Sequence, residues 1–164
     1  LLLQNEINLV DALIEKGRAR GMTIALNPSP FNGSLLKCDL GKVDIFLLNE
    51  VEGMQLTGET DEKRILQSLA ERFPGARIVL TMGEKGAQYR DAHCAYAQPA
   101  FPVKAVDTTA AGDTFTGYFL ASLAKNLPVA DALKIASRAA SIAVGRQGAS
   151  VSIPLWAEVT AAGR

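Results

Sequence analysis

The sequence has little of several residue types on which particular classes of protein depend. Among its 164 residues are two cysteines and one histidine. Cys38 and Cys94 have no metal-ligand spacing and cannot build a disulfide framework, so we expect reduced thiols in a cytoplasmic protein. His93 lies beside Cys94 in a predicted turn. We interpret it as a surface residue rather than a member of a catalytic triad or a metal ligand.

An excess of charge of one sign and long apolar runs are also missing. Seventeen basic residues balance seventeen acidic ones, and no basic run suggests nucleic acid or an anionic membrane as a partner. The opening Leu1-Leu2-Leu3 is interrupted at once by polar residues and is too short for a signal peptide or a membrane span. Because the chain opens inside an apolar run without an initiator methionine, we expect it to be part of a longer protein.

What is present is the composition of a soluble globular domain, 48% hydrophobic and 21% charged. Short apolar runs that predict buried strands cover residues 22–26, 43–48 and 77–81. Apolar spacing and end signals predict helices over 7–14 (closed by Gly17 to Gly21), 51–56 (ending at Gly58) and from Asp61 to about Phe73. This alternation favours a parallel sheet with crossover helices.

The pattern changes after residue 86. Short alternating strands with a turn near Asp91 predict an antiparallel edge between residues 86 and 106. The last third is predicted to be helical, over 111–125, 129–145 and a segment after Pro154. No internal repeat or linker is present, so we predict a single α/β unit.

Residues 106–115 carry the clearest chemical signal. Small residues at 110–112 let backbone amides approach a ligand closely, and the N–H groups at the start of the following helix favour a phosphate. Asp113 falls in the first helical turn, where a carboxylate can take a proton from a hydroxyl group. The amides can stabilise charge on a transferred phosphoryl group. The alternative is that Asp113 only interacts with the helix dipole, worth about 0.3–1 kcal/mol.

Two common nucleotide motifs are absent. The sequence contains no Gly-x-x-x-x-Gly-Lys-Ser/Thr, which excludes a P-loop kinase. No Gly-x-Gly-x-x-Gly follows a strand, which disfavours dinucleotide binding.

The segment Asp-Thr-Thr-Ala-Ala-Gly-Asp-Thr-Phe, residues 107–115, resembles the C-terminal signature of the ribokinase-like carbohydrate kinases. The resemblance covers nearly all of this chain but only the later part of the family's fold. It implies a ribokinase-like α/β fold, a parallel sheet flanked by helices with a small antiparallel edge, from which the N-terminal part and the lid are absent. Residues 1–164 would then be one C-terminal nucleotide-binding portion. Asp113 would be the catalytic base and contact the substrate, with Ala110, Ala111 and Gly112 as an anion hole.

Further segments match the family in the same order. Thr-Met-Gly-Glu-Lys-Gly at 81–86 is similar to the family's nucleotide-binding turn, and Asn-Glu-Val-Glu at 49–52 to its Asn-x-x-Glu element. Glu52 is thereby implied to act indirectly on Mg²⁺. Taken alone, Asn49 would be a helix cap and Glu52 a residue on a solvated face. The residues implied in ATP binding are Asn49, Thr81, Gly83, Gly86, Gly112 and Ser137.

Two more segments imply contacts with a sugar and with K⁺. Leu-Leu-Gln-Asn-Glu at 2–6 resembles the strand end whose glutamate reaches the sugar, which makes Glu6 the candidate substrate contact. The turn 27–30 is similar to the family's Asn-Pro-Ala-Pro turn. Residues 143–152 resemble a loop that helps to bind a monovalent cation, although they can also be interpreted as a glycine-containing helix exit. The implied cation ligands are Asp107, Thr109 and Ser152, together with the backbone carbonyls of Ala143, Arg146 and Gly148.

The function implied by the resemblance is ATP-dependent phosphorylation of a primary sugar hydroxyl, with D-ribose expected as the sugar, Mg²⁺ as cofactor and K⁺ as activator. ATP and the sugar are the expected partners, together with a second subunit if the complete protein dimerises. A fructokinase or a nucleoside kinase of the same family is an alternative. From another class, the alternative is a non-catalytic remnant that binds a nucleotide or a cation. Most sugar contacts of the family lie upstream, so the activity of this chain alone is in doubt.

Overall fold

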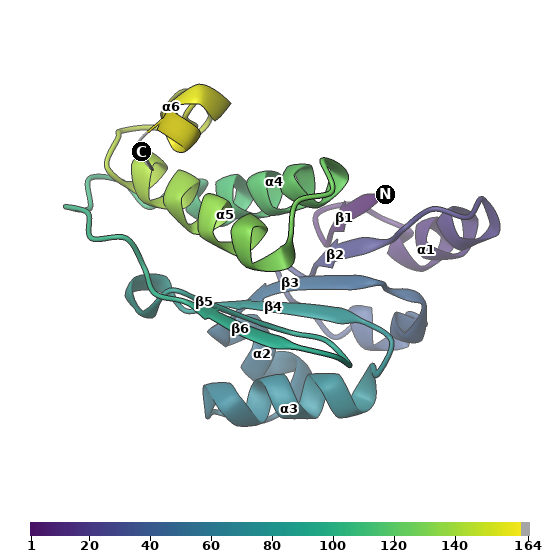
Figure 1. Ribbon diagram of the computed structural model, residues 1–164. Coiled ribbons are helices and arrows are strands. Elements are labelled where there is room, and N and C mark those ends of the chain that lie inside the picture. Colours follow the sequence, from purple (N-terminus) through teal and green to yellow (C-terminus); the bar gives the residue numbers. More distant parts are fainter. Residues whose placement is uncertain (162–164) are drawn as a thin grey trace. The chain divides into compact units, whose positions relative to one another are not determined.

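The computed structural model describes residues 1–161 of the chain, which form two compact units. The first unit is made of residues Leu1–Met82 and Gln88–Tyr96. The second is made of residues Gly83–Ala87 and the chain from Ala97 onward. Figure 1 labels their helices and strands. Within the described part of the chain, no helix has the length and apolar character needed to cross a membrane.

The first unit holds most of a six-stranded sheet, whose strands follow one another in the order of the sequence. The strands are β1 (Leu2–Gln4), β2 (Ala25–Asn27), β3 (Ile45–Asn49), β4 (Arg77–Thr81), β5 (Ala87–Arg90) and β6 (Ala95–Gln98). β1 to β4 pair in parallel, and the sheet has an antiparallel edge. The predicted parallel sheet with a small antiparallel edge is therefore confirmed.

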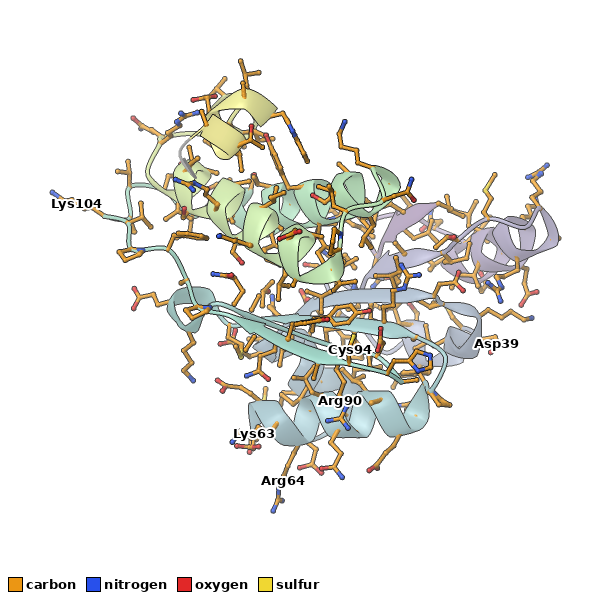
Figure 2. The ribbon with its side chains drawn as sticks, in the orientation of Figure 1. Asp39, Lys63, Arg64, Arg90, Cys94 and Lys104 are labelled. Atoms are coloured by element: carbon orange, nitrogen blue, oxygen red, sulfur yellow. The ribbon has the colours of Figure 1, made fainter. Side chains whose placement is uncertain are left out.

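Three helices belong to this unit: α1 (Val10–Ala19), α2 (Glu50–Thr57) and α3 (Glu62–Arg72). Short 3-10 helices η1 (Leu35–Lys37) and η2 (Leu40–Lys42) lie between β2 and β3. α2 and α3 lie on one side of the strands (Figure 1). The charged side chains of Lys63 and Arg64 point away from α3 (Figure 2).

The core of the first unit is built from the apolar runs of its strands and the inner faces of these helices. Phe46 and Ile78 of the sheet and Leu69 of α3 are fully buried in one cluster. The ring of Phe46 stacks on that of Phe73, with 4.7 Å between their centroids. Strands without polar alternation are expected where a parallel sheet is covered by other elements.

The ends of several elements differ from the predictions. The helix predicted over 7–14 begins only at Val10, and Ile7 is exposed outside it. Gly17 does not close this helix but lies buried inside it, where an added Cβ would be 2.5 Å from the Cδ1 of Ile24. The need for close packing explains this glycine. Gly21, with φ at 68°, lies at the end of the segment and donates its N–H to Arg18.

Local end signals were better guides for α2 and α3. Gly58 adopts the left-handed conformation after α2, with φ at 80°, and its N–H donates to the carbonyl of Met54. The side chain of Asp61 accepts the N–H of Arg64 at 3.0 Å and caps α3. Both predicted boundaries are confirmed because each depends on neighbouring residues alone.

The second unit is mainly helical. It contains η3 (Gly83–Lys85), α4 (Ala111–Ala124), α5 (Val129–Val144), η4 (Ser150–Ser152) and α6 (Trp156–Ala161). α4 packs along α5, and α6 contacts α5 (Figure 1). Trp156 of α6 stacks on Tyr118 of α4 at 5.5 Å, and the Tyr118 hydroxyl donates to the carbonyl of Pro154. The predicted helices 111–125 and 129–145 are confirmed to within one residue.

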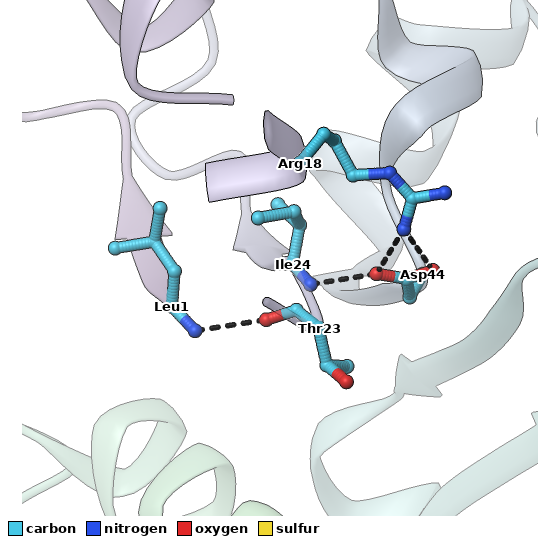
Figure 3. Close-up of polar contacts among 5 residues, drawn as sticks. All are labelled: Leu1, Arg18, Thr23, Ile24 and Asp44. Atoms are coloured by element: carbon cyan, nitrogen blue, oxygen red, sulfur yellow. Dashed lines mark hydrogen bonds and ion pairs between the residues drawn. The ribbon is translucent and has the colours of Figure 1, made fainter. Parts of the chain in front are cut away.

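Asp44 joins three segments of the first unit, and its contacts with Arg18 and Ile24 are drawn in Figure 3. Its carboxylate accepts two hydrogen bonds from Arg18, at the end of α1, and one of 2.7 Å from the amide of Ile24. Its backbone carbonyl accepts the N–H of Arg77, at the start of β4. The same view shows the amino group of Leu1 donating to the carbonyl of Thr23. These bonds fix the start of β2 against its neighbours.

We predict that Asp44→Ala destabilises the protein more than Arg18→Ala. Removing the carboxylate leaves the amide of Ile24, a fully buried residue, without its acceptor, which costs about 1–3 kcal/mol. Arg18→Ala removes only a half-exposed ion pair and should cost less than about 1 kcal/mol. Urea unfolding followed by circular dichroism measures both losses, and Asp44→Asn, which keeps an acceptor oxygen, should resemble Arg18→Ala. Equal losses for Asp44→Ala and Arg18→Ala would contradict this account.

Candidate active site

The carboxyl ends of the parallel strands carry polar residues. β1 and β2 end on the paired residues Gln4 and Asn27, and β3 and β4 end on the pair Asn49 and Thr81. Parallel strands direct their carboxyl ends to one edge of a sheet, which is where ligands bind in open α/β sheets. The hydroxyl group of Thr81 donates to the carbonyl of Leu48 at 3.4 Å. Two of the residues predicted to bind ATP, Asn49 and Thr81, are thus neighbours.

Asn49 and Glu52 form a capping box at the start of α2. The side-chain oxygen of Asn49 accepts the N–H of Glu52 at 2.9 Å, and the Oε2 of Glu52 accepts the N–H of Asn49 at 3.0 Å. The alternative that Asn49 is a helix cap is therefore confirmed. Glu52 does not lie on a solvated face, because only 6% of it is exposed. One carboxylate oxygen of Glu52 is therefore used to accept the N–H of Asn49, the N-cap residue of the same helix.

Glu6 is exposed in the turn that follows β1. The preceding residue, Asn5, was not among the predicted site residues, yet it joins this turn to the turn after β2. Its N–H donates to the carbonyl of Ser29 at 2.9 Å and its side-chain amide to the carbonyl of Pro30 at 2.7 Å. Asn27 helps to shape the second turn by accepting the N–H of Ser29. Glu6 thus projects from a turn that is braced by its neighbour.

Gly83 and Gly86, both predicted to bind ATP, have different surroundings in the second unit. Gly83 has φ at 52°, and an added Cβ there would meet no atom within 4 Å. Gly86 has φ at 101°, and its Cβ would lie 2.1 Å from the carbonyl oxygen of Gln98. Glycine at 86 is therefore required by the approach of the backbone at Gln98, whereas the space beside Gly83 is open.

Asp107 bridges two segments of the second unit. One carboxylate oxygen accepts the N–H of Thr109 and the other accepts the N–H of Gly148, each at 2.9 Å. The amides of Val106 and Asp107 both donate to the carbonyl of Val144, the last residue of α5. Hydrogen bonds from the Thr109 side chain and from the two amides lower the pKa of Asp107. The predicted ligands Asp107, Thr109 and Gly148 are thereby brought together.

The turn before α4 has an unusual backbone. Ala110 is the N-cap and lies in the left-handed region, with φ at 59°, a conformation that costs a non-glycine residue about 1–2 kcal/mol. The N–H of Ala111 donates to Thr108, and that of Thr114 to Ala110. A left-handed residue followed by right-handed ones turns successive N–H groups toward one concave side, which suits an anion.

Gly112 and Asp113 follow in the first turn of α4, and both are exposed. An added Cβ at Gly112 would meet no protein atom within 4 Å. Packing within the protein therefore gives no reason for glycine here, and the approach to the helix start is open. The residues that this turn brings together are the predicted anion hole, Ala110 to Gly112, and the predicted base.

Ser137 of α5 is buried, and its hydroxyl oxygen has no hydrogen-bond partner among the described residues. The hydroxyl oxygen of Thr114, a residue that sequence analysis missed, is likewise buried without a hydrogen-bond partner among the described residues. Buried polar groups without a partner are rare in native proteins. The Ser137 oxygen is enclosed, so a contact with adenine would require its side chain to turn outward. That contact stays a prediction.

The remaining predicted cation ligands lie at the end of α5 (Ala143), in the loop after it (Arg146) and in η4 (Ser152). The carbonyl of Ala143 accepts the N–H of Arg146 at 3.0 Å. The buried Ser152 donates its hydroxyl hydrogen to Ala149 at 2.6 Å, which leaves its oxygen lone pairs available. The side chain of Arg146 forms an ion pair with Glu158 of α6. A hydrogen bond from Arg146 lowers the pKa of Glu158.

The residues present suit hard cations to different degrees. Carbonyl, hydroxyl and carboxylate oxygens are the donors that K⁺ and Mg²⁺ accept, and Asp107, Thr109 and Gly148 are already held together by hydrogen bonds. Glu52 offers one carboxylate oxygen beyond its capping bond. Among residues 1–161, no three His, Cys, Asp or Glu side chains gather into a metal cluster. A cation beside Asp107 would therefore depend mainly on backbone oxygens.

Comparison with known proteins identifies the family and the fold. The model of the pfkB family of carbohydrate kinases matches residues 5–156. The ribokinase of Staphylococcus aureus is 34% identical over 96% of this chain and 53% of its own length. The deoxyribokinase of Salmonella typhi is 35% identical over 94% of the chain and 52% of its own length. The structure of Arabidopsis thaliana ribokinase complexed with ribose and ATP superposes with a TM-score of 0.82 at 28% identity, over 96% of this chain and 53% of that one.

The chain therefore belongs to the pfkB family of carbohydrate kinases, and its fold is ribokinase-like. It spans about half the length of the relatives that it matches, and the match is to their C-terminal portion. The sequence resemblance is confirmed at the level of family and fold.

We predict that Gly86→Ala destabilises the protein by more than about 2 kcal/mol, because strain in the backbone adds to the collision with Gln98. Gly83→Ala, with open space around it, should cost only about 1 kcal/mol. Urea unfolding curves of the two variants measure the difference. Similar midpoints for both would show that the approach to Gln98 does not require glycine at position 86.

Proposed function

We propose that the protein containing this chain transfers the γ-phosphoryl group of ATP to a primary hydroxyl group of a sugar, D-ribose, and releases ADP and ribose 5-phosphate. The observation that carries the proposal is the turn at the start of α4. There a left-handed Ala110 and an open Gly112 stand directly before Asp113. A helix start of this kind favours phosphate, and a carboxylate beside it can serve as a base.

The proposed reaction is a single displacement. Asp113 takes the proton of the sugar hydroxyl group while the oxygen of that hydroxyl group forms a bond to the γ-phosphorus of ATP. The bond between that phosphorus and the β–γ bridging oxygen breaks, and ADP leaves. The amides of Ala110 to Gly112 stabilise the charge on the transferred group. Asp107 contributes indirectly, because its bond to Thr109 lies within the turn and its bond to Gly148 fastens the turn to the loop after α5.

Cations have separate proposed roles. Mg²⁺ would neutralise charge on the ATP phosphates, with Asn49 and Glu52 near it. K⁺ would be held by Asp107, Thr109 and Ser152. The backbone carbonyls of Ala143, Arg146 and Gly148 would complete its set of ligands. K⁺ in that position would fix the backbone of the turn without entering the chemistry. Location in the cytoplasm and a homodimer of the complete protein belong to the same proposal.

The choice of D-ribose is supported by the names of the relatives. The same names include kinases of other sugars, so the identity of the sugar is the part of the proposal that most needs an assay. A ribokinase and a deoxyribokinase match the chain at almost equal identity. The assay should therefore offer ribose, 2-deoxyribose, fructose and a nucleoside side by side. Preferred turnover of any sugar other than ribose would replace the proposed acceptor. ATP binding without turnover of any acceptor would favour the non-catalytic remnant.

We predict that Asp113→Asn in the full-length protein lowers kcat by about 10²–10⁴-fold, while the Kd for ATP changes less than about twofold. The amide has nearly the same shape as the carboxylate but cannot take the proton. Asp131→Asn is a matched control, because Asp131 is an exposed acid in the first turn of α5, and it should leave kcat unchanged. ADP release by a coupled assay and ATP binding by calorimetry measure the two effects. Substantial turnover by Asp113→Asn would refute the proposed base.

We also predict that Gly112→Ala separates folding from catalysis. Alanine in place of an unstrained helical glycine stabilises a helix by about 0.5–1 kcal/mol, and no protein atom lies near its Cβ. The methyl group would instead crowd the phosphate, so turnover should fall at least about tenfold. Gly117 lies in the same helix and is equally open, so Gly117→Ala should raise the stability of the helix without lowering turnover. Full activity of Gly112→Ala would mean that no ligand approaches this amide closely.

A further inference from the structure

The ion pair between Arg146 and Glu158 connects the loop after α5 to the last helix of the described chain. Both oxygens of the Glu158 carboxylate are used, since Oε1 accepts from the guanidinium group of Arg146 and Oε2 accepts the N–H of Leu155. The pair thus closes the segment between residues 146 and 158 at a fixed point. Nothing in the family resemblance assigns a role to either side chain.

The segment that the pair closes begins in a short loop with two glycines, residues 145–148. Gly145 and Gly148 flank Arg146 closely, and Gly148 adopts φ at 96°, so the backbone here has few intrinsic restraints. Yet the amide of Gly148 must be aimed at Asp107, to which it donates at 2.9 Å. The carbonyl of Arg146 belongs to the same short loop. A restraint on the Arg146 side chain therefore limits the orientation of the groups that face Asp107.

A half-exposed ion pair commonly contributes little, because two long side chains must be ordered to form it. Here Glu158 belongs to α6, a helix that other contacts already hold in place. Trp156, at the start of α6, stacks on Tyr118, and the hydroxyl group of Tyr118 donates to Pro154. The cationic amine of Lys125 lies over the Trp156 ring as well, 5.2 Å from its centre. Since α6 is already anchored, the entropy lost on forming the pair falls mainly on Arg146.

We infer that Glu158 is a positioning residue, which holds Arg146 so that the loop 145–148 keeps the amide of Gly148 on Asp107 and its carbonyl oxygens in place for a monovalent cation. The cation part of this inference rests on the proposed function. The positioning of Gly148 does not, because it concerns a hydrogen bond within the chain.

The test compares Glu158→Ala, Glu158→Gln, Arg146→Ala and the double alanine variant in the full-length protein. Hydrogen exchange of the Gly148 and Thr109 amides is measured without nucleotide or sugar. Thermal midpoints are measured in KCl, NaCl and choline chloride at equal ionic strength. Glu15→Ala is the control, because it removes another ion pair, with Lys42 in the first unit, and should leave these amides unchanged.

We expect exchange at Gly148 to accelerate about fivefold in Glu158→Ala, the factor that corresponds to about 1 kcal/mol for a well-formed pair. Arg146→Ala and the double variant should show the same acceleration and no more, since either change removes the whole pair. Glu158→Gln keeps one acceptor oxygen, which can face the Arg146 guanidinium group, and should restore part of the protection. The KCl concentration for half of the thermal shift should rise by a similar factor in the alanine variants.

Unchanged exchange at Gly148 in Glu158→Ala would overturn the inference. So would equal acceleration at every amide of α4 and α5, which would indicate general loosening of the unit. If KCl shifts the midpoint of the unaltered protein no more than choline chloride does, the cation part fails. That outcome leaves the exchange result to decide the positioning of Gly148, and the Asp113 variant decides the kinase activity separately.

Discussion

The hydrogen bonds that the Asp107 carboxylate accepts are the interaction on which the candidate site of the second unit depends. They join the start of the turn before α4 to the loop after α5, two segments 41 positions apart in the sequence. Without them, the left-handed conformation of Ala110 would have to be held by the turn alone, at a cost of about 1–2 kcal/mol. Backbone strain at a site persists only where surrounding contacts determine it. Asp107 and the carbonyl of Val144 supply those contacts.

The same device recurs next to strands of the first unit. Asp44 accepts the buried amide of Ile24, and Asp91 accepts the amides of His93 and Cys94 in the turn between β5 and β6. Burial of Asp91 works to raise its pKa, but the hydrogen bonds from Tyr89 and from these amides outweigh it and lower the pKa to about 2. An acidic side chain near a turn therefore acts here first as an acceptor for the backbone, whose N–H groups must find partners.

These long-range acceptors mark the limit of what the sequence could predict. β4 and the ends of α2 and α3 depend on residues next to one another, and the predictions for them are confirmed. The prediction for the start of α1 is wrong because Ile7 fits the apolar spacing but is exposed, and Gly17 is a point of close packing inside the helix rather than its end. In the site, the contiguous residues 106–115 could be identified from their pattern. The roles of Asn5 and Glu158 could not, since they depend on Pro30 and Arg146, which lie 12 or more positions away.

Structural and chemical interpretations of one residue do not exclude each other, and Asn49 with Glu52 shows why. The capping box explains fully why an asparagine and a glutamate stand three residues apart at the start of α2. It also buries the Glu52 side chain at the carboxyl end of β3 and uses only one of its oxygens. A carboxylate oriented in this way loses little entropy on meeting a second ligand, because its rotamer is already chosen. Gly112 presents the converse, since no contact within the protein explains it. A residue whose structural role is complete can still take part in binding. An open glycine points to a ligand only where it stands beside other groups of a site, as Gly112 does beside Ala110 and Asp113, because Gly117 of the same helix is equally open.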